Sequence, residues 1–370
     1  MDFGRKLQAR RKALGLTLVQ AAKAAGLDSY QTVYKIEHGK RAIKVGELVA
    51  LAKAYALDVN YFLMSDSRVE QAQVFWRAEP PPPNAPRFEA LFRMYLDRFL
   101  HLLDILRYES TCPRLLPITR RIVSVLDAAE EGERYRKSLN LADRPALTFR
   151  RILEEEYNVP IFYMDMPQGS SASTVLSSNQ AVAIVINRKE VPWRRNFDIA
   201  HELFHVVYRH SGHDQCNQPS GGVYEQYANA FASALLLPRD SLEEEIARKR
   251  KQGSLGIADL AVIACDYDVS IDALVWRLVN LNRLTRTKAE QILSTEEVRD
   301  YYKSLGGRPA QRPPCVSARF LCMVYEAVSR GLMSQTRAAE YLNIPAGSLD
   351  RVFADAGLVL EGITESEISV

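Results

Sequence analysis

A run of four prolines at positions 80–83, with Pro86 close behind, limits the fold of this chain more than any other feature of its sequence. Proline fixes its own φ angle and has no amide hydrogen, so such a run cannot lie inside a helix or a paired strand. Consecutive prolines instead favour an extended, semi-rigid linker. We therefore expect a domain to end just before residue 80.

The length of 370 residues predicts two or three domains, and apolar spacing together with the proline-rich breaks divides the chain into four regions. Residues 1–66 predict short helices, and residues 67–144 predict a proline-rich linker and a helical connector. Residues 145–295 contain two short apolar runs typical of strands, followed by helices. After a second break, residues 315–370 predict a small helical C-terminal region. The expected fold class is mainly α with a small β-sheet (α+β).

The composition favours a cytoplasmic protein. No apolar run reaches the roughly 18 to 20 residues needed to cross a bilayer, and the first residues lack the apolar core of a secretory signal. The five cysteines are odd in number and form no C-x-x-C pair, as expected of reduced thiols. We expect no membrane contact.

The first region predicts an all-α domain of five short helices, the last near residues 60–63. Thr17 and Ser29 stand where they can cap the second and third helices, and Gly26 can close the second in a left-handed conformation. Lys and Arg outnumber Asp and Glu here, which favours a polyanionic partner. The segment LTLVQAAKAAGLDSYQTVYKIEHGKR resembles the lambda-repressor-like, or Xre-type, helix-turn-helix family.

That resemblance implies that the third helix enters the major groove of DNA, and that the protein binds as a homodimer to paired half-sites. Val33 and Ile36 are expected in the core. A front domain that only dimerises or binds another protein is the alternative. The residues expected to face DNA are Tyr30, Gln31, Thr32, Tyr34 and Lys35, with Lys35, Lys40 and Arg41 holding phosphate.

An H-E-x-x-H segment, His201 to His205, lies in an apolar helix predicted over residues 195–208. Residues four apart share one face of a helix, so both imidazoles can bind one ion while Glu202 lies beside the open coordination position. The spacing indicates one Zn²⁺ ion bound by His201 and His205, with Glu202 as general base. The alternative is a pair of buried structural histidines.

Zinc in a catalytic site takes a third protein ligand and keeps one position for water. Glu225 is the expected ligand because it begins a second apolar helix. Asn229 lies one turn further on, where it can hydrogen-bond the outer nitrogen of a ligating histidine. His210 and His213 are rival ligands, and a carboxylate that only stabilises the helix start is the alternative for Glu225.

The helix FDIAHELFH and the following E-x-x-A-N-x-F-A-x-x-L-L-L-P resemble the ImmA/IrrE-type metallopeptidase family over residues 145–285. This resemblance implies a zincin-like metallopeptidase domain with zinc-dependent endopeptidase activity. Two positions depart from the family pattern. Phe204 stands where glycine is frequent, which would narrow the site, and Tyr227 stands where an acidic residue is common.

Two further parts of a peptidase site stay open in the sequence. The strand predicted at residues 181–187 can serve either as an edge to which an extended substrate adds, or simply as core. An oxyanion-stabilising donor is also expected, and spacing does not choose among its candidates, which are Tyr208, His210, His213 and Tyr224.

The metallopeptidase resemblance implies cleavage of a helix-turn-helix repressor in a stress or mobile-element response. With both parts on one chain, we expect a zinc endopeptidase coupled to transcriptional regulation, whose partners are DNA and a protein substrate, a transcriptional repressor or regulator. The alternative is a DNA-binding transcription factor whose metallopeptidase-like domain senses a ligand, metal or protein without proteolysis. Glu202 favours the enzyme, since a sensor needs the ligands but not the base.

Overall fold

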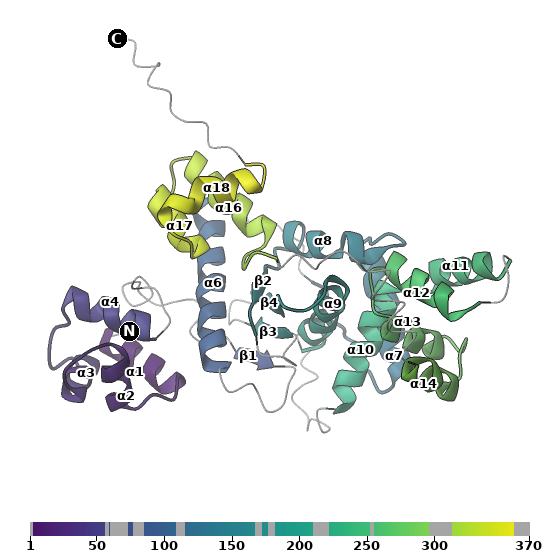
Figure 1. Ribbon diagram of the computed structural model, residues 1–370, viewed down its shortest axis with the longest axis horizontal. Coiled ribbons are helices and arrows are strands. Elements are labelled where there is room, and N and C mark those ends of the chain that lie inside the picture. The colour runs from purple at the N-terminus through teal and green to yellow at the C-terminus, as the bar shows by residue number, and fades with distance from the viewer. Residues whose placement is uncertain are drawn as a thin grey trace, which may run out of the picture.

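The computed structural model describes residues 3–55, 59, 73–76, 85–108, 115–166, 172–176, 182–209, 222–251, 255–295 and 313–358. This part of the chain is mainly helical and contains one four-stranded sheet, which confirms the predicted α+β class (Figure 1). None of the described helices combines the length and the apolar character needed to cross a bilayer. The helix predicted near residues 60–63 lies outside the described residues.

The first four helices form a small bundle, and the helix-capping residues predicted from the sequence cap them. Thr17 Oγ1 accepts a hydrogen bond from the Gln20 amide at 3.2 Å, and the Gln20 side chain accepts one from the Thr17 amide at 2.9 Å. Ser29 Oγ accepts from the Gln31 amide at 3.2 Å, and Gly26 has a φ of +63°. The helices are α1 (Phe3–Ala13), α2 (Leu18–Ala24), α3 (Tyr30–Glu37) and α4 (Val45–Ala54).

A buried ion pair joins α1 to α3. The Arg11 guanidinium donates to both carboxylate oxygens of Glu37, at 2.6 and 2.8 Å, and to the Leu16 carbonyl at 2.8 Å. The Glu37 side chain is fully buried. Gly4 allows the close approach of the two helices, because a Cβ atom there would lie 2.6 Å from the Glu37 carbonyl oxygen. The pair therefore sets the position of α3 in the bundle.

Replacing Glu37 with alanine would leave the Arg11 guanidinium buried without its partner. We expect α1 and α3 to lose about 3 to 5 kcal/mol of local stability. At about 1.4 kcal/mol per factor of ten, their amides should exchange with solvent at least about 100-fold faster. Hydrogen exchange on the full chain measures this rate.

Arg41→Ala is the matched control, because it breaks the half-exposed pair of Arg41 and Glu47, whose atoms lie 2.8 Å apart. A pair of this kind contributes about 1 kcal/mol or less. Exchange in α1 should then rise less than about tenfold. Equal effects of the two substitutions would show that the buried pair does not hold the bundle together.

One mixed sheet lies at the centre of the chain, with strand order β1-β3-β4-β2. β2 runs parallel to β4, and the other neighbours are antiparallel. β4 lies between β3 and β2, so the strand predicted at residues 181–187 is internal and offers no free edge. The strands are β1 (Gln73–Trp76), β2 (Ile161–Met164), β3 (Ala172–Leu176) and β4 (Val182–Asn187).

Both faces of the sheet are covered by helices. On one face, Ile161 and Ile184 share a core with α9 (Pro192–Arg209). On the other, Phe162 and Val185 share a core with α6 (Ala85–Ile105), as the two sides of the sheet in Figure 1 show. A sheet buried on both faces accounts for the near-continuous apolar runs in β2 and β4.

α6 joins the sheet to the C-terminal helices. Its Tyr95 ring stacks on Phe162 with centroids 5.5 Å apart, and Phe162 meets Phe320 edge-on at 6.0 Å. The sequence predicts a linker and helical connector over residues 67–144, and within this region α6 packs directly on the sheet. The C-terminal elements are α16 (Ala318–Ser329), α17 (Gln335–Leu342), the 3₁₀ turn η3 (Ala346–Ser348) and α18 (Leu349–Asp355).

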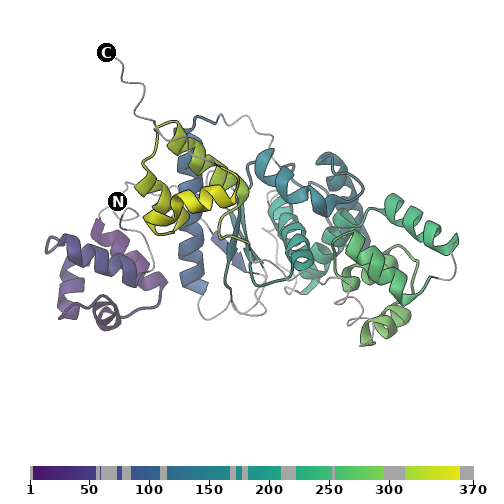
Figure 2. The ribbon, with the colours of Figure 1, turned by 45° about the horizontal axis from the view of Figure 1, so that its top comes forward.

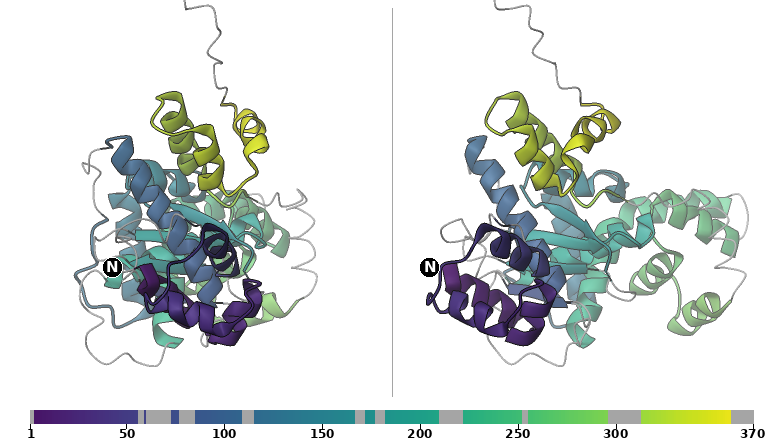
Figure 3. Two further views of the ribbon diagram at one scale, coloured as in Figure 1. Left: turned by 90° about the vertical axis from the view of Figure 1, so that its left-hand side faces the viewer. Right: turned by 60° about the vertical axis from the view of Figure 1, so that its left-hand side comes forward.

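The two ends of the molecule lie on opposite sides of this centre. Arg10 donates to the Pro86 carbonyl at 3.4 Å and Ala90 belongs to the bundle's core, so the N-terminal helices lie against the start of α6 (Figures 2 and 3). The other end holds α11 (Arg239–Lys251), α12 (Ile257–Asp266), α13 (Ile271–Asn280) and α14 (Arg286–Ser294) (Figure 2). Between them lie α7 (Val125–Ser138), η1 (Pro145–Leu147), α8 (Phe149–Glu155) and α10 (Gly222–Leu236).

A buried carboxyl group, Glu154 of α8, contacts the C-terminal region. Glu154 is 3% exposed. Burial raises the pKa of Glu154 to about 7, against the smaller opposing effects of a hydrogen bond with Ser317 and the charge of Arg150. The folded protein therefore favours the protonated form of this group.

The raised pKa of Glu154 makes stability depend on pH. Its contribution is fully present below the ordinary value of 4.5 and is lost as pH rises through about 7. The shift corresponds to about 3 kcal/mol of the free energy of unfolding. Glutamine stays neutral, so in Glu154→Gln the free energy of unfolding in urea should no longer fall by this amount between pH 5 and pH 8. Glu290→Gln, an exposed carboxylate on α14, should leave it unchanged, and an unaltered slope in Glu154→Gln would contradict the assignment.

Candidate metal centre

The helix α9 presents two imidazoles on one face. It begins at Pro192, a residue suited to the first helical turn, three residues before the predicted start. His201 is fully buried and His205 is 9% exposed, while Ile199 and Leu203 lie in the core beneath them. Residues four apart on a helix face the same way, so both Nε2 atoms point to one place, 3.2 Å apart.

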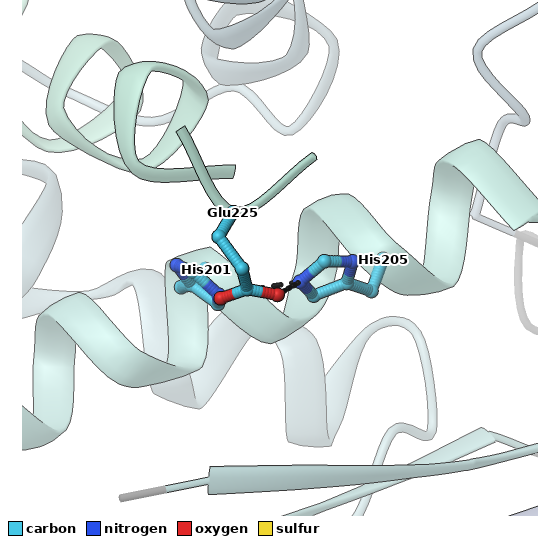
Figure 4. A group of neighbouring side chains, drawn as sticks. All are labelled: His201, His205 and Glu225. Carbon is cyan, nitrogen blue, oxygen red and sulfur yellow. Dashed lines mark hydrogen bonds and ion pairs between the residues drawn. The ribbon is translucent and has the colours of Figure 1, made fainter. Parts of the chain in front are cut away.

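The first turn of α10 brings Glu225 to the same place. Its Oε2 lies 3.0 Å from His201 Nε2, and its Oε1 lies 3.2 Å from His205 Nε2. Figure 4 shows the carboxylate facing both rings from the neighbouring helix. These three residues are the only group of metal-binding side chains found within the described residues.

The separations of these atoms fit a zinc ion. Three ligands at the corners of a tetrahedron, each 2.0 to 2.1 Å from zinc, lie about 3.3 Å apart. The three separations here are 3.0, 3.2 and 3.2 Å. Two histidines and one glutamate also form a known ligand set of catalytic zinc, which leaves a fourth position open.

Asn229 favours one tautomer of the His201 ring. Its Oδ1 lies 3.0 Å from His201 Nδ1, so the ring donates its Nδ1–H to the amide oxygen. The lone pair then remains on Nε2, the atom that faces Glu225. This is the usual outer partner of a metal-binding histidine. α10 thus supplies both the carboxylate and, one turn later, the group that orients the ring.

The Glu225 carboxylate is held in its charged form. Burial would raise the pKa of Glu225, but its contacts with the imidazoles of His201 and His205 lower it well below the ordinary value of 4.5. The group is therefore ionised at neutral pH, as a metal ligand must be. Glu202, the residue expected to act as base, is 2% exposed on α9.

An aromatic cluster lies beside the two histidines. Phe204 is fully buried, stacks on Tyr208 with centroids 5.3 Å apart and lies 5.5 Å from Phe231. Its ring therefore packs into the core. The sequence comparison instead led us to expect that this side chain narrows the site. Tyr208 hydrogen-bonds the Ile122 backbone and Tyr224, and both tyrosines stay candidates for stabilising an oxyanion. His210 and His213 lie outside the described residues.

The structure adds one contact near the site that no sequence motif indicates. The Ile118 amide donates to the Val207 carbonyl at 3.0 Å. Together with the bond between Ile122 and Tyr208, this places the segment before α7 along the end of α9. A backbone contact between residues so far apart in sequence leaves no pattern of side chains by which it could be predicted.

The expected DNA-facing residues lie on the accessible side of α3. Val33 and Ile36 are buried as predicted, whereas the other expected residues are exposed or partly exposed. Lys40 Nζ lies 5.3 Å from the centre of the Tyr34 ring, and Arg41 is paired with Glu47 at 2.8 Å. Arg41 is therefore already partly neutralised. The exposed or partly exposed set is Tyr30, Gln31, Thr32, Tyr34, Lys35, Lys40 and Arg41.

The structure thus joins a helix-turn-helix bundle to a domain with a His-His-Glu cluster. Comparison with known families agrees. Residues 2–60 match the helix-turn-helix domain family, and residues 154–279 match the IrrE N-terminal-like domain family. Both resemblances drawn from the sequence motifs are thus confirmed.

Comparisons with individual proteins add less. No curated protein matches the chain. Among solved structures, a Mycobacterium tuberculosis transcriptional regulator is similar, with 16% sequence identity and a TM-score of 0.33. The similarity covers 51% of this chain and 54% of that one, so the chain spans about half the length of this relative.

Substitutions at the cluster should change zinc binding in graded steps. His205→Ala and Glu225→Ala each remove a ligand and should leave the purified protein with little zinc. Asn229→Ala keeps every ligand and should weaken zinc binding about 10- to 100-fold. Zinc content by mass spectrometry and competition with a chelator measure both effects.

Glu290→Ala is the control, because it removes an exposed carboxylate from α14. It should bind zinc as the unaltered protein does. Full zinc content in Glu225→Ala would place the third ligand elsewhere in the chain.

Proposed function

We propose that this protein is a cytoplasmic zinc endopeptidase coupled to transcriptional regulation, which cleaves a helix-turn-helix repressor or regulator in a stress or mobile-element response. The observation that carries the proposal is the set of three donor atoms, His201 Nε2, His205 Nε2 and a Glu225 oxygen, at 3.0 to 3.2 Å. A buried Glu202 beside the first histidine supplies a base in the same turn of α9.

The residues present would divide the work of peptide hydrolysis among them. A zinc ion bound by the three residues would polarise the peptide carbonyl and make a water molecule more acidic. Glu202 would accept one proton from the attacking water as its oxygen bonds to the carbonyl carbon. Glu202 would then deliver that proton to the leaving nitrogen as the carbon–nitrogen bond breaks. Asn229 would hold the His201 ring in place throughout.

The N-terminal domain supports a role at DNA. In the proposed complex, Gln31 and Thr32 at the start of α3 would face base edges, while Lys35 and Lys40 would contact phosphates. A homodimer would place two such helices on paired half-sites. This binding would bring the peptidase to the operator where its protein substrate sits.

Glu202→Gln separates catalysis from metal binding. The substitution removes the base but no ligand, so zinc content should stay unchanged while cleavage of a susceptible repressor falls by about 100- to 10,000-fold. Purified protein, loaded with zinc and incubated with a panel of helix-turn-helix repressors, provides the assay. Glu290→Gln is the matched control and should cleave normally.

One structural observation favours the second candidate, a transcription factor that senses without cutting. Within the described strands, β3, which lies beside α9, is already paired with β1, and the Tyr163 amide of β2 already donates to the Cys315 carbonyl. The same variants decide between the two functions. If Glu202→Gln leaves regulation in cells intact while Gln31→Ala abolishes it, the sensor is the correct assignment.

A further inference from the structure

The edge of the sheet beside the metal-binding helix is occupied by a strand from outside the metallopeptidase-like domain. β1 pairs antiparallel with β3 over four residues, from Gln73 opposite Leu176 to Trp76 opposite Ser173. β1 precedes α6, whereas the match to the metallopeptidase-like family begins at residue 154. The linker region of the chain therefore completes the sheet of the catalytic unit.

The two edges of the sheet differ in what lies next to them. α9, which carries His201 and His205, packs against β3 and β4. At the far edge, β2 is hydrogen-bonded to the C-terminal region, because the Tyr163 amide donates to the Cys315 carbonyl at 2.9 Å. The β3 edge is thus the one on the side of the metal-binding helix.

An extended peptide commonly binds a protein by adding a strand to an exposed sheet edge. Backbone hydrogen bonds then provide affinity whatever the side chains are. An antiparallel partner pairs the free amide and carbonyl groups of the edge strand. β1 already makes this arrangement with β3. A peptide that pairs directly with β3 on this side must therefore take the place of β1.

We propose that β1 is an exchangeable strand, which holds the β3 edge at rest and leaves it when an extended segment of the protein substrate pairs there. This inference rests on the proposed peptidase function and specifies how its substrate binds. A strand of four residues at a sheet edge is short enough to exchange, because such pairings are only marginally stable by themselves. β1 lies in the chain between the DNA-binding bundle and α6, so the bundle and the site are linked through it.

Peptide binding tests the exchange without any cleavage. The probe is a fluorescein-labelled peptide of residues 70–79, EQAQVFWRAE, and the protein is the full chain carrying Glu202→Gln. Proline at an edge strand is harmless where the amide faces solvent but removes a bond where the amide faces the sheet. Adjacent residues alternate in this respect, so only one of Val74→Pro and Phe75→Pro should release β1, and the other serves as its control.

The releasing variant should bind the peptide at least about tenfold more tightly than the parent, because apparent affinity rises with the fraction of molecules whose edge is open. Hydrogen exchange should place the peptide's protection on residues 172–176. Val74→Thr keeps a strand-forming residue and should bind as the parent does. Unchanged affinity in both proline variants, or protection elsewhere, would overturn the proposal.

A reversible lock gives a second test that does not depend on the proline variants folding. Phe75 lies opposite Thr174, so Phe75→Cys with Thr174→Cys can join β1 to β3 under oxidising conditions. The oxidised protein should lose peptide binding, and a reductant should restore it, while Phe75→Cys alone should show neither effect. Peptide binding by the oxidised, cross-linked protein would rule out exchange.

These binding results are distinguishable from failure of the proposed function. Repressor cleavage that persists in the cross-linked protein would leave the peptidase intact and reject exchange. Strand exchange without cleavage by any zinc-loaded variant would keep the docking edge and reject the peptidase.

Discussion

The close contact between α7 and α10 is the constraint on which the His-His-Glu cluster depends. At Gly132 of α7 the two backbones approach so closely that any Cβ atom would clash with the Phe231 carbonyl. On its other side α10 meets α9, where Phe231 lies 5.5 Å from Phe204. α10 is therefore fixed between two helices, and the carboxylate of Glu225 is fixed with it.

This arrangement explains how the candidate metal site is held together. Glu225 and Asn229 leave α10 one turn apart, and His201 and His205 leave α9 one turn apart. Two rigid helices thus set all four side chains, and none of them depends on a loop. Sites held on regular elements keep their geometry better than sites on loops. A glycine with no polar role is in this sense as important to the cluster as its ligands.

The parts of the site that could be predicted from sequence are those encoded over a single helical turn. The spacing of His201 and His205 and that of Glu225 and Asn229 are local, and helix geometry alone places each pair on one face. The caps at Thr17 and Ser29 are local in the same way. Contacts between distant residues follow other rules, as the pairing of Arg11 with Glu37 shows, because no spacing links residues on different helices.

β1 shows most clearly why the rest could not be predicted. Its four residues, QVFW, do not alternate between polar and apolar side chains, and the strand forms because β3, about a hundred residues later, lies beside it. α6 was visible as an apolar helix, but its partner was not, because periodicity shows that a face is buried without showing against what. The position of the Phe204 ring in the core could not be predicted for the same reason, since its neighbour Phe231 belongs to another helix.

The second core, between the sheet and α6, has a consequence for what counts as a unit of this protein. The stretch recognised by family comparison, residues 154–279, contains all three residues of the candidate metal site but only one side of that core. Phe162 and Val185 are covered by Tyr95 and Phe99 from before this stretch and by Phe320 from after it. A fragment trimmed to the recognised bounds would expose an apolar sheet face and tend to aggregate. The smallest piece able to fold alone is therefore larger than the piece that sequence similarity defines, and it must extend from α6 to the C-terminal helices.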